Sequence, residues 1–231
     1  MRIRLRQIVM VAADLASVET QIVDQLGVEL CYRDPGVGHF GLRNALFPIG
    51  DKLLEVVSPI QDGTTAGRFL DKRGGDGGYM VIFEVDDLDA ARGRIADAGA
   101  RIVFEARDDG VVGLHLHPAD VGGAIVSIDA TDTWGEWPWA GPVWRDHVST
   151  DRVDDVLGVE VAAVDPDAMA ARWAAVLGRD AAGRTIELDE GVITFVAADE
   201  RGDGVAGFVL RGARGADPID TTIAGCRLRT A

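Results

Sequence analysis

Three segments of the 231-residue chain share one pattern, and this repeat constrains the fold more than any other feature. Each segment has an apolar run, an aspartate, an alanine-rich amphipathic stretch, a glycine and a second apolar run. The three segments are VMVAADLASVETQIVDQLGVEL, IFEVDDLDAARGRIADAGARIV and VAAVDPDAMAARWAAVLGRDA. The pattern predicts a chain built from copies of one strand, helix and strand unit.

The aspartate and the glycine of each segment fit the two ends of a helix. Asp14, Asp87 and Asp165 stand 73 and 78 positions apart, and each precedes its glycine by 12 or 13 positions. An aspartate at a helix N-cap accepts hydrogen bonds from first-turn amides, and a glycine takes the positive φ at which a helix stops. We therefore expect these residues to be structural.

Further strand-like runs follow each predicted helix. In the first unit they are expected near 28–33, 40–47 and 52–57, and in the second near 101–105, 111–117 and 123–129. The third unit is expected to have a strand at 156–164, a helix at 167–177 and strands at 185–188 and 192–197. GVAGFVLRG and TIAGCRLRT resemble the outer strands of a fourth unit without its helix. The predicted fold class is α+β, with tandem βαβββ units in cup-shaped mixed sheets and a degenerate second pair of units at the C-terminus.

A stretch rich in tryptophan and proline, TWGEWPWAGPVWRD, separates the two halves and holds four of the five tryptophans. We predict a paired βαβββ domain over 1–131, a linker over 132–149 and a third unit with a truncated fourth over 150–231. Indoles in such a linker are expected to pack against both domains and hold them together. The alternative is an aromatic platform for a ligand.

Charge and cysteine content narrow the partners. With 23 basic and 38 acidic side chains the formal net charge is −15, which repels nucleic acid and anionic membranes. Cys31 and Cys226 are too few for a disulfide framework or a cysteine-rich metal site. Asp14 interrupts the first apolar run before a signal peptide or membrane span forms. We predict a cytoplasmic monomer or homodimer that binds a small molecule.

Paired βαβββ units are the build of the vicinal oxygen chelate superfamily of glyoxalases, bleomycin resistance proteins and extradiol dioxygenases. Residues 1–130 resemble its methylmalonyl-CoA epimerase branch in the PIGD turn, the LLEVVSP strand, the AGRFLDKRGG helix, the FEVDDLDAA segment and the HPADVGG loop. Residues 150–231 resemble only the general unit. The resemblance implies an open cup with a divalent metal inside.

The resemblance places the four ligands of that metal at Gln7, Glu55, Met80 and Ser127, where the family has histidine, glutamate or glutamine, histidine and glutamate. A neutral amide, a thioether and a hydroxyl are poor ligands for a hard divalent ion. Only Glu55 remains a good ligand. We therefore predict no cofactor and no metal at these positions, and we expect Gln7, Met80 and Ser127 to line a substrate site.

Strand parity predicts a second set of site residues. His115 and His117 lie two apart on one strand and so share a face, and analogy with the epimerase places both in the cavity with Glu55. The three are predicted to be catalytic, as a metal-free acid and base set, because imidazole and a half-buried glutamate can titrate near neutral pH. The alternative is a metal site made of two histidines and one carboxylate.

A structural alternative also exists for each histidine, namely that His117 caps the loop before Pro118 and that His115 is a satisfied core residue. By the same parity Arg43, Ala45 and Phe47 are expected to face inward, with Arg43 binding an anionic group and Phe47 lining the substrate site. His39, in a glycine-rich loop that can close over the cup, is a further substrate-binding candidate.

These residues predict an isomerase or lyase that moves a proton beside the carbonyl of a small carbonyl or carboxyl compound, with a CoA thioester implied by the resemblance alone. The replaced ligands argue against glyoxalase or dioxygenase chemistry, which depends on the metal. One alternative is a non-catalytic small-molecule-binding or antibiotic-sequestering protein that resembles the bleomycin resistance proteins. Another is that the C-terminal half only covers the open face of the first half.

Overall fold

The computed structural model describes residues 1–231, and the chain divides into two compact units. Unit 1 comprises residues 1–6, 80–138 and 157–205, and unit 2 comprises residues 7–79, 139–156 and 206–231. The two units interleave along the chain, whereas the sequence predicted sequential domains with boundaries near 131 and 150. The sequential division stays a prediction.

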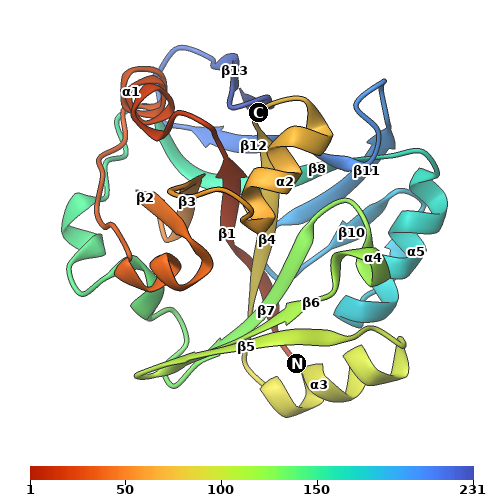
Figure 1. Ribbon diagram of the computed structural model, residues 1–231. Helices are drawn as coiled ribbons and strands as arrows, with labels where there is room; N and C mark the ends of the chain where they lie inside the picture. The colour runs from red at the N-terminus through yellow and green to blue at the C-terminus, as the bar shows by residue number, and fades with distance from the viewer. The chain divides into compact units, whose positions relative to one another are not determined.

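Unit 2 combines the first repeat with the C-terminal strands. Its elements are β1 (Ile3–Val11, which begins in unit 1), α1 (Leu15–Leu26), the 3-10 helix η1 (Pro35–Phe40), β2 (Leu42–Ile49), β3 (Lys52–Pro59), α2 (Thr65–Arg73), the 3-10 helix η3 (Trp144–His147), β12 (Gly204–Gly212, which begins in unit 1), β13 (Asp220–Ile223) and β14 (Cys226–Thr230). Strand β3 pairs in parallel with β1 and antiparallel with β2. Strand β14 likewise pairs in parallel with β12 and antiparallel with β13. Helix α1 contacts β2, β3 and β13 and so joins the two repeats (Figure 1).

Unit 1 combines the second repeat with the third. Its elements are β4 (Gly77–Val85, which begins in unit 2), α3 (Leu88–Asp97), β5 (Ile102–Asp108), β6 (Val111–Leu116), α4 (Pro118–Val121), β7 (Ile125–Thr131), β8 (Val153–Ala163, which begins in unit 2), α5 (Pro166–Leu177), β9 (Ala181–Ala182), β10 (Thr185–Glu187) and β11 (Val192–Ala197). The second repeat has the strand order β4-β7-β6-β5 and the third has β8-β11-β10-β9. Helices α3 and α5 contact each other. A further 3-10 helix, η2 (Pro138–Ala140), follows β7.

All four repeats have the same strand pairing. In each, the last strand pairs in parallel with the first strand and antiparallel with the strand that precedes it in the chain. The fourth repeat has no helix between β12 and β13. This arrangement confirms the predicted α+β class with tandem units of one strand pattern in mixed sheets and a degenerate C-terminal pair, although the first unit has one strand fewer than predicted. None of the helices has the length and apolar character needed to span a bilayer.

The predicted helix caps are confirmed. The carboxylates of Asp14, Asp87 and Asp165 accept hydrogen bonds from the third backbone amide of α1, α3 and α5 at 3.2, 2.9 and 3.0 Å. Gly27 and Gly178 follow α1 and α5 with φ of 67° and 63°, a conformation in which a side chain is strained. These residues therefore set where three helices begin and where two of them end.

The first repeat departs from its predicted strands. Residues 28–33 form only an isolated bridge between Tyr32 and Leu46, and the strand expected from residue 40 begins at Leu42. Asp34 and Pro35 start a 3-10 helix that ends at Gly41, and proline has no N–H for a strand ladder. The turn follows this segment directly, and the segment bridges β2 only at Tyr32.

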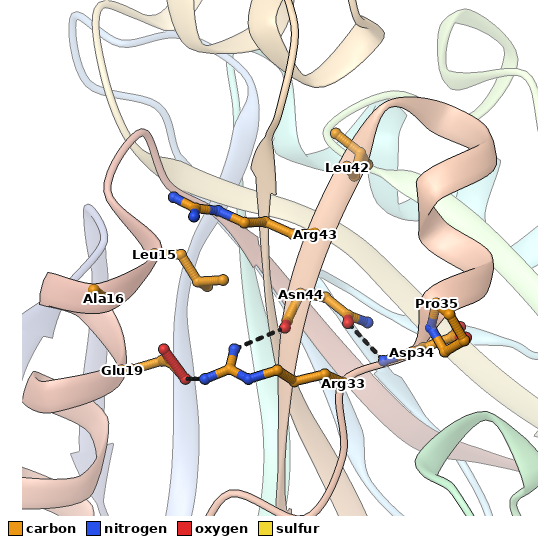
Figure 2. Close-up of a pocket in the computed structure, with 9 residues that line it drawn as sticks. All are labelled: Leu15, Ala16, Glu19, Arg33, Asp34, Pro35, Leu42, Arg43 and Asn44. Carbon is orange, nitrogen blue, oxygen red and sulfur yellow. Dashed lines mark hydrogen bonds and ion pairs between the residues drawn. The ribbon is translucent and has the colours of Figure 1, made fainter.

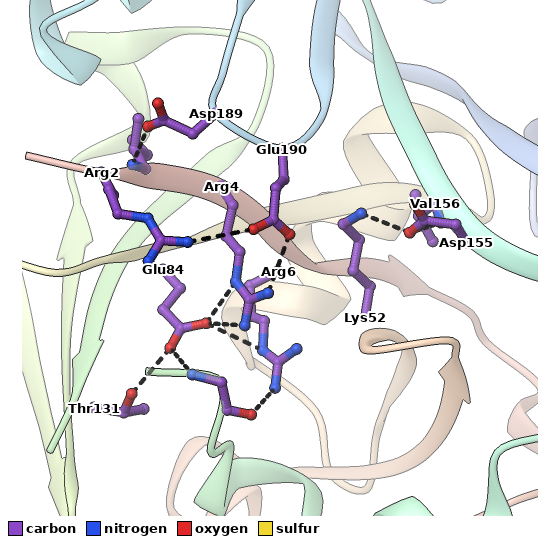
Figure 3. Close-up of polar contacts among 12 residues, drawn as sticks. Arg2, Arg4, Arg6, Lys52, Glu84, Thr131, Asp155, Val156, Asp189 and Glu190 are labelled. Carbon is purple, nitrogen blue, oxygen red and sulfur yellow. Dashed lines mark hydrogen bonds and ion pairs between the residues drawn. The ribbon is translucent and has the colours of Figure 1, made fainter. Parts of the chain in front are cut away.

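Unit 1 contains a cluster of buried charges, drawn in Figure 3. The guanidinium of Arg4 donates to Glu84 Oε2 at 2.8 and 2.6 Å, and Arg6 Nε lies 3.4 Å from the same oxygen. The hydroxyl of Thr131 and the amide of Gly135 donate to Glu84 Oε1 at 3.0 and 2.9 Å. One fully buried carboxylate therefore offsets two buried guanidiniums.

Two indoles of the tryptophan-rich stretch lie against these arginines. The guanidiniums of Arg2 and Arg4 lie 4.2 and 4.7 Å from the centre of the Trp134 ring, and that of Arg6 lies 5.1 Å from Trp137. Both indoles thus pack within unit 1. The expectation that the indoles hold the two predicted domains together therefore stays a prediction.

Candidate functional site

The buried carboxylate of Glu55, on β3, is the centre of the candidate site in unit 2. Its side chain accepts a hydrogen bond at each oxygen, from Gln7 Nε2 at 2.8 Å and from Asn44 Nδ2 at 2.6 Å. Burial raises the pKa of Glu55 to about 7, and the two amide hydrogen bonds oppose that rise. Glu55 therefore changes its charge near neutral pH, as the sequence interpretation required.

Strand register explains why these three residues meet. Glu55 pairs with Val9 on β1 and with Leu46 on β2, and directly paired residues point to the same side of a sheet. Gln7 and Asn44 each lie two positions from those partners. All three polar side chains therefore emerge from one sheet face.

The same register corrects the predicted orientation of Arg43, Ala45 and Phe47. They alternate with Leu46, the partner of Glu55, and so lie on the opposite face of β2. Phe47 is fully buried there, and Arg43 is exposed. The prediction was wrong because the inward face of this strand was assigned by analogy with the epimerase rather than from the residue that pairs with Glu55. Neither Arg43 nor Phe47 shares the sheet face of Glu55.

Asn44 was missed in the sequence, and it connects Glu55 to a cavity. Besides donating to Glu55, its side-chain oxygen accepts from the amide of Asp34 at 2.8 Å, and its backbone oxygen accepts from Arg33 at 3.2 Å. An asparagine inside the largely apolar run LRNALFPI was a usable signal, because a buried amide needs partners. The parity error assigned it to the wrong face.

The cavity has a volume of about 460 Å³ and lies along the outer edge of β2, between that strand, the start of α1 and the segment before η1 (Figure 2). Its lining residues are Leu15, Ala16, Glu19, Arg33, Asp34, Pro35, Leu42, Arg43 and Asn44. This volume falls within the range of roughly 300–1,000 Å³ that is usual for small-molecule sites. The pocket is therefore large enough for a ligand.

Unit 1 gathers three of the other predicted residues on one sheet face. His115 is paired with Ser127, and Met80 is paired with Ile125, two positions before Ser127. The hydroxyl of Ser127 donates to the buried carboxylate of Asp129. The ring of His115 lies 5.4 Å from that of Phe104, and burial lowers the pKa of His115 to about 4. His115 is therefore neutral at pH 7 rather than titrating there as expected.

The other two histidines predicted as site residues, His117 and His39, have simpler surroundings. His117 is the N-cap of α4, where its Nδ1 accepts from the amide of Ala119 at 3.1 Å, which supports the capping alternative. His39 is exposed in η1, with its ring edge-on to Phe40 at 5.2 Å. Its proposed closing role stays a prediction. Neither unit gathers three or more His, Cys, Asp or Glu side chains in an arrangement that can hold a metal ion.

The donors around Glu55 do not fit the metal that the superfamily implies. Gln7 and Asn44 both turn N–H groups, the positive ends of their dipoles, toward the carboxylate. A divalent cation bound to the same oxygens would meet these dipoles unfavourably. The arrangement instead suits a carboxyl group that gains and loses a proton. The metal set of Glu55, His115 and His117 stays a prediction without support.

Four copies of a strand-rich repeat, paired through parallel first and last strands, define a member of the vicinal oxygen chelate superfamily. This chain belongs to the glyoxalase-like domain family, whose model matches residues 8–177.

Individual proteins that resemble this chain have the same kind of fold. An ethylmalonyl-CoA/methylmalonyl-CoA epimerase of Cereibacter sphaeroides is 27% identical over 132 aligned positions, and the match covers 54% of this chain and 96% of the relative. A Streptomyces coelicolor methylmalonyl-CoA epimerase variant, solved with 2-nitronate-propionyl-CoA, has a TM-score of 0.51 at 23% identity and covers 56% of this chain and 98% of its own. A mutant 4-hydroxymandelate synthase of Streptomyces coelicolor has a TM-score of 0.69 at 15% identity over 90% of this chain and 70% of its own. That last likeness concerns the fold alone and extends through the C-terminal repeats.

Proposed function

We propose that this protein is an isomerase-type enzyme that moves a proton at the carbon beside the carbonyl of a small acyl-CoA thioester, with Glu55 as the base. The observation that carries the proposal is the buried Glu55 carboxylate, held on one sheet face by two amide donors. The substrate class is supported by the epimerase relatives, which act on or bind CoA thioesters.

The chemistry assigned to Glu55 is a single proton transfer. Its ionised carboxylate accepts the proton, the C–H bond breaks, and the electron pair moves onto the thioester oxygen as an enolate. A proton returned to the same face of this carbon restores the substrate, whereas a proton delivered to the opposite face gives its isomer, and either step restores the carbonyl. A pKa of about 7 suits both directions, because the carboxyl group is populated in both forms near neutral pH.

Gln7 and Asn44 act as positioning residues in this proposal. Their N–H groups fix both carboxylate oxygens and limit how far burial raises the pKa of Glu55. The catalytic role expected of His115 stays a prediction, and its imidazole, with a pKa of about 4, carries no extra proton at pH 7. No divalent metal takes part, in line with the donors around Glu55.

The proposal is tested by Glu55→Gln in deuterated water. We expect wild-type protein to exchange the C2 proton of methylmalonyl-CoA for deuterium, and the variant to do so at least about a hundredfold more slowly, as for the loss of a general base. NMR follows the C2 signal, with and without EDTA. Exposed Glu29, also in unit 2, provides the matched control Glu29→Gln.

Equal exchange rates in wild type and Glu55→Gln would eliminate Glu55 as the base. Activity lost in EDTA, together with a stoichiometric metal that disappears in His115→Ala, would overturn the metal-free chemistry. A wild-type protein that binds methylmalonyl-CoA without exchanging its proton would instead favour a non-catalytic binding role.

A further inference from the structure

The side chain of Arg43 has no partner in the protein. It lines the cavity beside β2 and takes part in no hydrogen bond, ion pair or ring contact. The other basic side chain of the cavity differs, because Arg33 donates to Glu19 Oε1 at 2.5 Å. An arginine that faces a cavity with all five N–H donors unused is available to a ligand.

The start of helix α1 adds positive potential to the same end of the cavity. Figure 2 shows Arg43 reaching from β2 toward Leu15, the first residue of α1, and Ala16 follows it in the lining. The first amides of a helix have no intrahelical partner and carry part of the positive end of its dipole. The first turn contains no acidic residue, and the N-cap Asp14 engages the amide of Ser17.

The negative groups of the cavity are already engaged. Glu19 is paired with Arg33, and the carboxylate of Asp34 accepts from the amide of Gly36 at 2.7 Å. Asp34 also lies across the cavity from the guanidinium of Arg43 (Figure 2). An anion beside Arg43 and Leu15 would therefore contact the guanidinium and the first turn of α1 rather than these carboxylates.

We propose that this cavity is an anion-binding subsite in which Arg43 and the start of α1 bind a carboxylate or phosphate group. A planar guanidinium forms two parallel hydrogen bonds with either group. That this anion is the remote arm of the substrate rests on the proposed function. Asn44 supports that link, because it lines the cavity and donates to Glu55.

This assignment moves the predicted anionic contact of Arg43 to a different place. The sequence interpretation put Arg43 beside Glu55 in one cavity, whereas the two side chains leave opposite faces of the sheet. Arg43 then binds a part of the ligand away from the reacting carbon, and one residue, Asn44, separates the subsite from the base. Binding energy gained there can orient the reacting carbon.

The test is direct binding of three probes at low ionic strength: inorganic phosphate, malonate and coenzyme A. Backbone NMR signals are followed in wild type, Arg43→Gln and the control Arg214→Gln, whose arginine is exposed in unit 2 and has no partner. We expect at least one probe to shift the signals of Leu15, Ala16 and Arg43. Its Kd should rise roughly tenfold or more in Arg43→Gln, as for the loss of a charge-assisted hydrogen bond, and should not change in Arg214→Gln.

The probes separate the two anion chemistries. Malonate binding identifies a carboxylate subsite, whereas binding of phosphate and coenzyme A identifies a phosphate subsite. Absence of binding by every probe, or an equal Kd in wild type and Arg43→Gln, would overturn the subsite. The measurement involves no turnover, so it stands apart from the Glu55→Gln test. If Glu55→Gln slows proton exchange but Arg43→Gln leaves binding unchanged, Glu55 remains the base and the subsite is rejected. If Arg43→Gln weakens binding but Glu55→Gln exchanges as fast as wild type, only the role of Glu55 as the base is rejected.

Discussion

At the scale of single residues, Glu55 couples the candidate site to stability. Its pKa rises from 4.5 to about 7 on folding, mainly because burial penalises the charged carboxylate. Because the folded-state pKa is raised, the protonated Glu55 side chain contributes its full stabilisation below about pH 4.5, and this contribution is lost as pH rises through about 7. The full effect of such a shift is about 3 kcal/mol.

Urea unfolding of wild type and Glu55→Gln near pH 4.5 and near pH 8 measures this coupling. Since the amide introduced in the variant does not ionise, we expect the free energy of unfolding of the wild type to fall by about 3 kcal/mol relative to the variant between the two pH values. Comparing two proteins cancels the other titrating groups. A constant difference would mean that Glu55 is not held in an environment that disfavours its charge.

The residues of the site were predictable in part. Gln7 and Glu55 were identified from the sequence and do bond to each other, and His115 and Ser127 do share a face. Asn44 was missed, and Arg43 and Phe47 were placed on the wrong face. Strand alternation shows which residues point the same way, but the choice between the two faces depends on pairing with β3, a strand that begins ten residues later in the chain.

At the scale of elements, the N-cap aspartates carry a testable share of stability. Asp165 accepts from the amide of Ala168 at 3.0 Å at the start of α5, a helix that buries Trp173 and Leu177. We expect Asp165→Ala to lower the free energy of unfolding by about 1 kcal/mol. Asp165→Asn keeps an acceptor oxygen and should remain close to wild type. Thermal or urea unfolding compares the three proteins, and equal losses in both variants would contradict a capping role.

Helices and strands were easiest to predict where the residues that determine them lie close together in the sequence. Caps and helical periodicity lie within about a dozen residues, and α1, α3 and α5 were all anticipated. The strand expected at 28–33 did not form, and a 3-10 helix begins directly after it, at Pro35. Only Tyr32 finds a bridge to β2.

At the scale of the whole molecule, Glu84 connects distant parts of the chain within unit 1. It accepts hydrogen bonds from Arg4, Thr131 and Gly135, which lie 80, 47 and 51 positions away. We expect Glu84→Gln to lower the free energy of unfolding by roughly 3–5 kcal/mol, because two buried guanidiniums lose the buried carboxylate that they share.

A half-exposed glutamate provides the comparison. Glu190 pairs with the same Arg4 at 3.2 Å, but 41% of its side chain is exposed. Glu190→Gln should therefore cost no more than about 1 kcal/mol. Urea unfolding of both variants separates the two cases, and similar losses would show that burial does not set the cost of removing the charge.

The amino-acid sequence by itself determined the repeat, the helix caps and most of the succession of helices and strands along the chain, because these depend on contacts between residues close in the chain. Tertiary structure decided which repeats pack together, first with fourth and second with third. It also decided which face of β2 carries Asn44 rather than Arg43, and hence the partners of Glu55. Such choices depend on register and burial between segments far apart in sequence, and no local pattern contains that information.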